Sequence, residues 1–449
     1  MKKTLITLSI TAAALVAVPP YFLGFSIFNL GHAAQVATSL SAKLACSARY
    51  ISGFDDQQIV SDLSSYSPIT ELVELQWSES PSRVSANLFG LAPTVATYRD
   101  GIGCSLDHEE GFDLDSLAVQ KTEIRPDLEW PRGSLVTTIN SELQSTLDNI
   151  IQQDNEQGLN SRAMVVVQDG KVVAEAYGDN THPETPLLGW SMAKSVTAMM
   201  LGRLELEGKV SRDTSGLFPE WDDERADLKL RDLLQMSSGL TFDETYAPGS
   251  DSTHMLFTAP SASGVAMTSP QGHEPGTHFS YSSGTTNLLS RYIQQLLDNQ
   301  PQNTIDFLTR ELFAPAGIAT ATFETDPSGV LVGSSYLYAS GRDWARLGLM
   351  MAANGEINGY QVLAPEWVEA ASTPNNSDNE KAYGYQFWLN RGDDQLRWPS
   401  LPEDAYAMMG NRKQSVMVIP SEQVVLVRLG WTTGEYPMET NYRGLLQSM

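Results

Sequence analysis

Cysteine and histidine are both scarce in this chain of 449 residues, which contains two cysteines and six histidines. It has no C-x-x-C and no H-E-x-x-H motif, so the common spacings of a zinc site are absent. His273 and His278 are five residues apart without a third ligand to complete a cluster, and we interpret them as polar surface residues. The sequence therefore predicts no metal site.

Basic residues are also few. The chain has 29 lysines and arginines against 54 acidic residues, a formal net charge of -25. Phosphate binding requires positive charge, so nucleic acid is excluded as an expected partner, and the acidic surface favours solubility. The sequence shows no internal repeat and no low-complexity tract. Its hydrophobic content of 41% is that of an ordinary globular protein, long enough for one large domain or two smaller ones.

No charged residue occurs in the apolar run from Leu5 to about Leu30, which follows Met1-Lys2-Lys3. The run is longer than the ~7–15 residues of a signal-peptide core, and ~20 apolar residues cross a bilayer. We expect residues 1–34 to be an N-terminal membrane anchor, or else a signal peptide cleaved at the small residues after His32. Either route predicts an exported protein, in the periplasm or on the extracytoplasmic face of the membrane.

The two cysteines, Cys46 and Cys104, fall in residues 35–125, an N-terminal exported region of mixed helical and extended pieces without a known motif. In an exported chain a lone pair of cysteines predicts a disulfide, which fits better than two free thiols or a reactive site. The stretch 126–133 has two prolines and one glycine and is predicted to be a linker. Residues 126–449 then form the main domain.

The main domain begins and ends with elements that suit one antiparallel sheet. Residues 134–155 have helical spacing, and two β-rich runs flank Asp169-Gly170, a strong hairpin signal. The C-terminal runs 415–419 and 424–429 form a second hairpin. We expect an α/β fold in which helices flank this sheet, the stretch 191–353 is inserted as a helical lobe, and a cleft lies between them.

Ser191 is the one serine with a lysine three residues downstream, and it opens an apolar helix that reaches Gly208. Positions i and i+3 share a helix face, so Ser191 and Lys194 are predicted to point into one cleft. Burial favours the neutral amine, which can accept the serine proton during attack on a carbonyl carbon. The alternative is that Ser191 is only the helix N-cap.

A second candidate element, Tyr281-Ser282-Ser283, follows a turn-rich polar run that is predicted to be a surface loop. Tyr50 and Tyr338 also begin Y-x-S triplets. We interpret Tyr338 as a core or cap residue of the helix predicted over 339–353, and Tyr50 lies beside Cys46. Tyr281 is therefore the candidate. A third element, residues 410–414, precedes the strand 415–419.

These three elements in this order, S-x-x-K, Y-x-S and a short motif on a C-terminal edge strand, resemble the serine β-lactamase and penicillin-binding protein superfamily. The tyrosine is similar to that of its class C, D-alanyl-D-alanine carboxypeptidase, esterase and 6-aminohexanoate-dimer hydrolase branch. The resemblance covers roughly residues 130–449. It implies a β-lactamase-like fold and an acyl-enzyme on Ser191, with Lys194 and Tyr281 sharing the role of base and Ser283 as a relay. The backbone N–H groups of Ser191 and Gln414 would form the oxyanion hole, and no cofactor is required.

The third element departs from the family pattern, in which small residues are usual. Asn411 and Arg412 are candidate substrate-binding residues, and a guanidinium binds carboxylates well. The alternative is that Arg412 faces solvent, which we favour for Lys413. The remaining pocket candidates are aromatic, although an aromatic cluster at strand spacing is more often part of a core: Tyr383, Tyr385, Phe387 and Trp388.

The substrate is not determined by these motifs. We expect a serine hydrolase acting on a small ester or amide. The alternatives are a β-lactamase or peptidoglycan D,D-peptidase, and a penicillin-binding sensor that is acylated once without turnover. The sequence makes no prediction of the oligomeric state.

Overall fold

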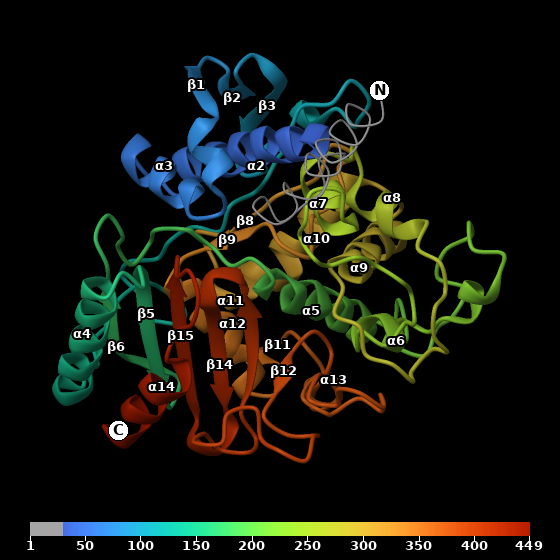
Figure 1. The fold of residues 1–449 in the computed structure, drawn as a ribbon. Helices are drawn as coiled ribbons and strands as arrows, with labels where there is room; N and C mark the ends of the chain where they lie inside the picture. Colours follow the sequence, from blue (N-terminus) through green and yellow to red (C-terminus); the bar gives the residue numbers. More distant parts are fainter. Residues whose placement is uncertain (1–29) are drawn as a thin grey trace, which may run out of the picture.

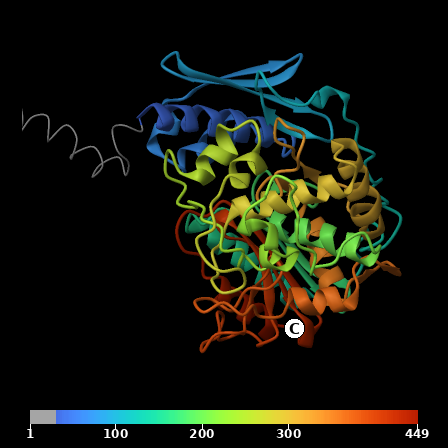
Figure 2. The same ribbon diagram turned by 90° about the vertical axis from the view of Figure 1, so that its right-hand side faces the viewer.

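The computed structural model describes residues 30–449. Residues 30–116, here called the N-terminal module, lie against one end of the main domain (Figures 1 and 2). Helix α2 (Leu30–Tyr50) packs across a four-stranded antiparallel meander in the order β1-β2-β3-β4. The other elements of the module are α3 (Asp56–Ser64), η2 (Pro68–Leu72), β1 (Glu74–Glu79), β2 (Ser82–Leu88), β3 (Leu91–Arg99), β4 (Gly103–Leu106) and η3 (Leu114–Ser116).

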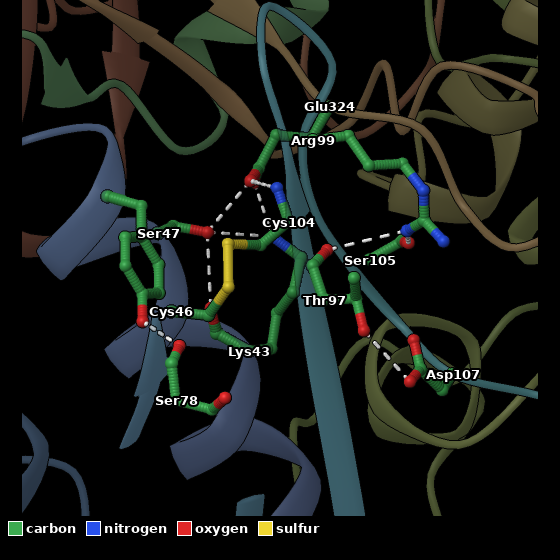
Figure 3. The surroundings of a disulfide bond; sticks show 11 residues. Lys43, Cys46, Ser47, Ser78, Thr97, Arg99, Cys104, Ser105, Asp107 and Glu324 are labelled. Carbon is green, nitrogen blue, oxygen red and sulfur yellow. Dashed lines mark hydrogen bonds and ion pairs between the residues drawn. A yellow bond between two sulfur atoms is a disulfide. The ribbon is translucent and has the colours of Figure 1, made fainter. Parts of the chain in front are cut away.

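A disulfide joins α2 to β4. Cys46 and Cys104 are bonded as expected, with Cα atoms 6.1 Å apart (Figure 3). The expected boundary at residue 34 falls within helix α2 (Leu30–Tyr50), next to the buried Ala33. The apolar run before residue 30 lies outside the described residues. Within residues 30–449, no helix combines the length and the apolarity that crossing a bilayer requires.

The main sheet is antiparallel and has the order β12-β13-β14-β15-β5-β6. Its strands are β5 (Ser161–Gln168), β6 (Lys171–Tyr177), β12 (Trp388–Leu389), β13 (Tyr406–Gly410), β14 (Gln414–Ile419) and β15 (Val424–Gly430). Strand β15 pairs with β5, with Val427 opposite Val165. The two predicted hairpins therefore join into one sheet, as expected from the sequence.

Helices cover both faces of this sheet (Figure 1). Helices α4 (Ser141–Glu156) and α14 (Met438–Gln447) share one hydrophobic cluster with Met164 and Val166. Helix α12 (Gly341–Ala352) packs on the opposite face, which carries the alternate strand residues such as Val165. The stretch 191–353 was expected to be a lobe beside the sheet, and that expectation was wrong for α12, because its apolar face packs on the strands themselves.

The rest of the inserted segment forms the helical lobe. The central helix is α5 (Met192–Leu206), which is buried along most of its length. Around it lie α6 (Leu230–Leu234), α7 (Asp251–Phe257), α8 (Ala262–Met267), α9 (Ser283–Leu296), α10 (Pro301–Phe307), η5 (Leu308–Phe313), α11 (Ala314–Ala316) and α13 (Pro365–Ala371). The short elements η4 (Glu224–Asp227), β10 (Glu356–Ile357), β11 (Tyr360–Gln361), η6 (Asn411–Lys413) and η7 (Pro420–Glu422) connect the larger ones.

A small sheet connects the lobe to the N-terminal module. It has the order β7-β9-β8, formed by Leu187–Leu188, Leu337–Ala339 and Thr322–Phe323. Strand β7 leads directly into α5, so the start of α5 lies where the main sheet, the lobe and the module meet. This meeting point positions Ser191.

Candidate active site

Ser191 occupies the turn between β7 and α5. It is the N-cap residue of α5, yet its hydroxyl makes no capping hydrogen bond. The residue before it, Trp190, has a φ of 49°, a left-handed conformation that costs free energy in a bulky residue and that is held here by burial. The hydroxyl is therefore not engaged as a cap, and the interpretation of Ser191 as only an N-cap was wrong.

Lys194 lies one turn further along α5 and is 1% exposed. Its Nζ donates hydrogen bonds to Ser283 Oγ at 2.9 Å and to the Ser334 carbonyl at 3.0 Å. Loss of hydration lowers the pKa of Lys194 to about 8, while the charge of Glu244 acts in the opposite direction. A neutral amine has two N–H groups, and both are used by these partners, so its lone pair remains available to accept a proton.

Tyr281 contributes the second candidate base. Its hydroxyl interacts with the Ser191 side chain, and the Lys194 Nζ lies 5.1 Å from the centre of its ring. Burial raises the pKa of Tyr281 well above its usual value, although the interaction with Ser191 opposes this effect. Trp388 stacks on the Tyr281 ring at 5.5 Å and Tyr383 meets its edge at 6.2 Å. Two of the four aromatic candidates therefore support Tyr281.

The other two aromatic candidates lie in the core. Tyr385, expected to bind substrate, is buried against Trp367 at 5.3 Å and close to Arg212. Phe387 is fully buried against Tyr406. Neither lines the cavity beside Ser191, because both side chains pack in the main hydrophobic core. The substrate-binding prediction for Tyr385 is therefore not supported by its position.

Ser283 and Glu244 form a chain of hydrogen bonds behind Lys194. Ser283 Oγ accepts from Lys194 and donates to Glu244 Oε1, and the Ser283 backbone N–H donates to Glu244 Oε2 at 2.8 Å. Tyr246 donates its hydroxyl to the same carboxylate at 2.8 Å. Our sequence analysis did not identify Glu244 or Tyr246. Both lie in a polar loop, and one carboxylate among 54 acidic residues gives no signal of its own.

The two rejected Y-x-S tyrosines lie elsewhere. Tyr338 is buried on β9, in the strand just before the helix that it was predicted to open. Tyr50 is on α2, stacks on Tyr98 and donates to the Ser78 carbonyl at 2.7 Å. Neither contacts Ser191, so Tyr281 is the Y-x-S tyrosine that the fold brings to it.

The side chain of Gln414 does not line the cavity beside Ser191. It exchanges hydrogen bonds with the backbone of Gly430 and lines a separate small cavity. The end of β13 approaches Gly189, since a methyl group at Gly410 would lie 2.1 Å from the Gly189 carbonyl oxygen. Residues 411–413 form a tight turn that places Gln414 opposite Gly410, and the oxyanion role of the Gln414 backbone N–H stays a prediction.

The three residues of this turn have different surroundings. Asn411 is exposed and lines the cavity beside Ser191. Arg412 is buried, with its guanidinium bonded to the Ser65 carbonyl and stacked 4.0 Å from the ring of Tyr66. It therefore faces the N-terminal module, and both expected positions, towards a substrate carboxylate and towards solvent, were wrong. Lys413 is partly exposed beside Glu435, in agreement with the solvent-facing alternative.

A cavity of about 350 Å³ lies beside Ser191. The main domain contributes seven lining residues: Trp190, Ser191, Tyr246, Pro248, Thr253, Phe257 and Asn411. The N-terminal module contributes the other eight, from α2 and from residues 66–70. Within residues 30–449 no group of three or more histidine, cysteine or acidic side chains could hold a metal ion. The arrangement of nucleophile, buried amine and tyrosine can transfer an acyl group.

Comparisons with known proteins agree with this geometry. Residues 147–446 match the sequence profile of the Beta-lactamase family. A 6-aminohexanoate-dimer hydrolase from Paenarthrobacter ureafaciens is 22% identical over 283 residues, covering 60% of this chain and 71% of that protein. A family VIII carboxylesterase structure has a TM-score of 0.55 at 10% identity, covering 70% of this chain and 99% of its own. A penicillin-binding protein homologue from Caulobacter crescentus has a TM-score of 0.53 at 15% identity, with coverages of 70% and 99%. The chain belongs to the Beta-lactamase family and is a serine hydrolase.

Proposed function

We propose that this enzyme hydrolyses a small ester or amide through an acyl-enzyme on Ser191. The observation that carries the proposal is the grouping of Ser191 with Tyr281 and with buried Lys194, whose amine is held by Ser283. The apolar character of the cavity beside Ser191 supports an uncharged substrate. The relatives named as a 6-aminohexanoate-dimer hydrolase and a family VIII carboxylesterase support hydrolysis of an amide or an ester.

In this mechanism Lys194 is the final proton acceptor. Its pKa of about 8 is close to neutrality, whereas the pKa of Tyr281 is raised above its ordinary value near 10, so the amine loses its proton first. Tyr281 contacts Ser191 and relays the proton while Ser191 attacks the carbonyl carbon. The same pair then activates the water that releases the acyl group. Ser283 and Glu244 hold the amine in place.

The backbone N–H groups of Ser191 and Met409 are the donors that we propose for the oxyanion hole. The Asn390 N–H donates to the Ala405 carbonyl at 2.9 Å, and Ala407 pairs with Trp388 on the same side of β13. Backbone N–H groups alternate between the two edges of a strand, so the Met409 N–H lies on the same edge of β13 as the backbone groups of Ala405 and Ala407. Strand β12 ends before it reaches Met409, so no β12 residue pairs with it. This edge lies next to the start of α5.

Covalent labelling tests the proposal. A small fluorophosphonate should modify Ser191, located by peptide mass mapping, and Ser191→Ala should abolish the adduct. Steady turnover of a chromogenic ester would separate a hydrolase from a penicillin-binding sensor, which stops after one equivalent. Lys194→Ala should reduce turnover by several orders of magnitude in a protein of unchanged fold. An adduct on another serine would contradict the assignment.

A β-lactamase or D,D-peptidase is the second candidate, supported by the family and by the penicillin-binding homologue of similar fold. Hydrolysis of a chromogenic cephalosporin faster than of any ester in the same panel would favour it.

A further inference from the structure

The N-terminal module forms half of the wall of the active-site cavity, although it lies outside the family match over residues 147–446. The face of α2 that lines the cavity carries Ala33, Val36, Ala37 and Leu40. These positions follow the spacing i, i+3, i+4 and i+7 of one helix face. The segment from Tyr66 to Thr70 supplies the adjacent part of the wall.

This wall is held to the main domain by buried polar contacts. Glu324 is fully buried beside β8, where it pairs with Lys43 of α2 and accepts hydrogen bonds from Ser47 Oγ and the Cys104 N–H at 2.8 and 2.6 Å (Figure 3). Lys43 also lies 4.1 Å from the ring centre of Tyr336. One carboxylate therefore binds both α2 and β4, close to the disulfide that joins them.

Two further contacts hold the rest of the wall. Arg162 of β5 forms a buried ion pair with Asp62 of α3. Arg412, in the turn after β13, bonds to the Ser65 carbonyl and stacks on Tyr66. Buried ion pairs with several additional hydrogen bonds fix geometry well. The module is therefore a fixed part of the cavity.

The lining of the cavity has no charged side chain among residues 30–449. Its apolar surface comes from both sides, with Leu40 and Ile69 in the module and Phe257 in the lobe. A volume of about 350 Å³ holds on the order of ten groups of the size of water or methylene, at about 30 Å³ each. A carboxylate or ammonium group in this space would lose part of its hydration without meeting an oppositely charged partner.

We propose that the N-terminal module determines substrate specificity by forming one side of a pocket for an uncharged apolar substituent of the substrate. This inference rests on the proposed function, because the pocket opens at Ser191. The substituent can belong to the acyl group or to the leaving group, and both place the same chemistry against α2.

Chain-length profiles test the proposal. In one series p-nitrophenyl esters from acetate to octanoate vary the acyl group, and in the other acetate esters of alcohols of increasing length vary the leaving group. Burial of each methylene should raise kcat/KM about fourfold until the pocket is full. The series in which kcat/KM rises with chain length shows whether the acyl group or the leaving group occupies the pocket. An ester of matched length that ends in a carboxylate should react at least tenfold more slowly than its neutral counterpart.

Two substitutions on α2 should move this profile in opposite directions. Ala37→Leu fills the pocket, so the hexanoate-to-acetate ratio of kcat/KM should fall at least tenfold. Leu40→Ala enlarges the pocket and should move the optimum to longer chains. Ala34→Leu adds the same bulk to α2 at a neighbouring position that does not line the cavity, and it should leave the profile unchanged.

The outcomes separate the two proposals. Failure of the fluorophosphonate to label Ser191 in the full chain would overturn the proposed function. Labelling and ester turnover with flat profiles in both series, or with equal effects of Ala37→Leu and Ala34→Leu, would overturn the role of the module alone. If Ala37→Leu does not fold, Leu40→Ala decides, because it only removes atoms. A profile unchanged in Leu40→Ala would then contradict the proposal.

Discussion

Glu244 allows a sharp test of the catalytic network, because it acts on Lys194 without contacting it. Two hydrogen bonds through Ser283 Oγ, of 2.9 and 2.5 Å, join the amine to the carboxylate, so Nζ and Oε1 lie at most about 5.4 Å apart. At that separation Coulomb's law with an effective dielectric constant of about 20 gives about 3 kcal/mol, which is about two pKa units. Solvent at half-exposed Glu244 reduces the effect.

We therefore expect Glu244→Gln to lower the pKa of Lys194 by about half a unit to two units. The base must be neutral to accept a proton, so kcat/KM of the native enzyme should rise with pH through about 8. Removing the negative charge favours the neutral amine, and the rising limb of the variant should move to lower pH.

The assay is the pH dependence of kcat/KM for a neutral ester that does not itself ionise between pH 5 and 10. Asp243→Asn is the matched control, since it removes the same charge from the adjacent exposed residue and should shift the limb much less. A limb that stays in place in Glu244→Gln, or that moves to higher pH, would refute the electrostatic link between Glu244 and Lys194.

Three further predictions concern single side chains. Tyr281→Phe should slow acylation about 10²–10⁴-fold, measured by stopped-flow with a chromogenic ester. Tyr338→Phe should acylate at nearly the native rate. A larger effect of Tyr338→Phe than of Tyr281→Phe would show that the wrong tyrosine was chosen. Lys43→Met should reduce the free energy of unfolding by about 3–5 kcal/mol, because it leaves the buried carboxylate of Glu324 unpaired. Urea denaturation would measure the change in the free energy of unfolding. The double variant Lys43→Met with Glu324→Gln should recover part of the lost stability. A loss below about 1 kcal/mol in Lys43→Met would contradict the reasoning. Arg412→Ala should lower the melting temperature and alter the chain-length profile equally for neutral and anionic esters, and a loss confined to anionic esters would place its guanidinium at the substrate.

The predictions that succeeded rest on local patterns. The hairpin at Asp169-Gly170 and the C-terminal hairpin have strand periodicity and turn residues that act over a few residues. The i, i+3 spacing of Ser191 and Lys194 is likewise a property of one helix. The order of three short motifs was specific enough to identify the family, and the two cysteines, with the expectation of export, were sufficient to predict the disulfide.

The positions that failed depend on contacts between distant segments. Arg412 and Lys413 are consecutive left-handed residues in the turn after β13, and the Arg412 side chain is directed to Ser65 and Tyr66. Nothing in residues 410–414 reveals that geometry, because it depends on how the turn closes against Gly430 and Ser65. Tyr385 looked the same as Tyr383 in sequence, and only packing separated a core residue from one that supports Tyr281.

The N-terminal module shows the same division most clearly. Its sequence predicts mixed secondary structure and a disulfide, both of which depend on neighbouring residues and on cysteine chemistry. The sequence gives no sign that one face of α2 lines the active site, since a stripe of alanine, valine and leucine has the same pattern whatever it packs against. Residues 36 and 191 come together only because Lys43 meets Glu324 and Arg412 meets Tyr66 across hundreds of residues. Local physics determined the nucleophile and its base, and tertiary packing decided the wall that the substrate meets.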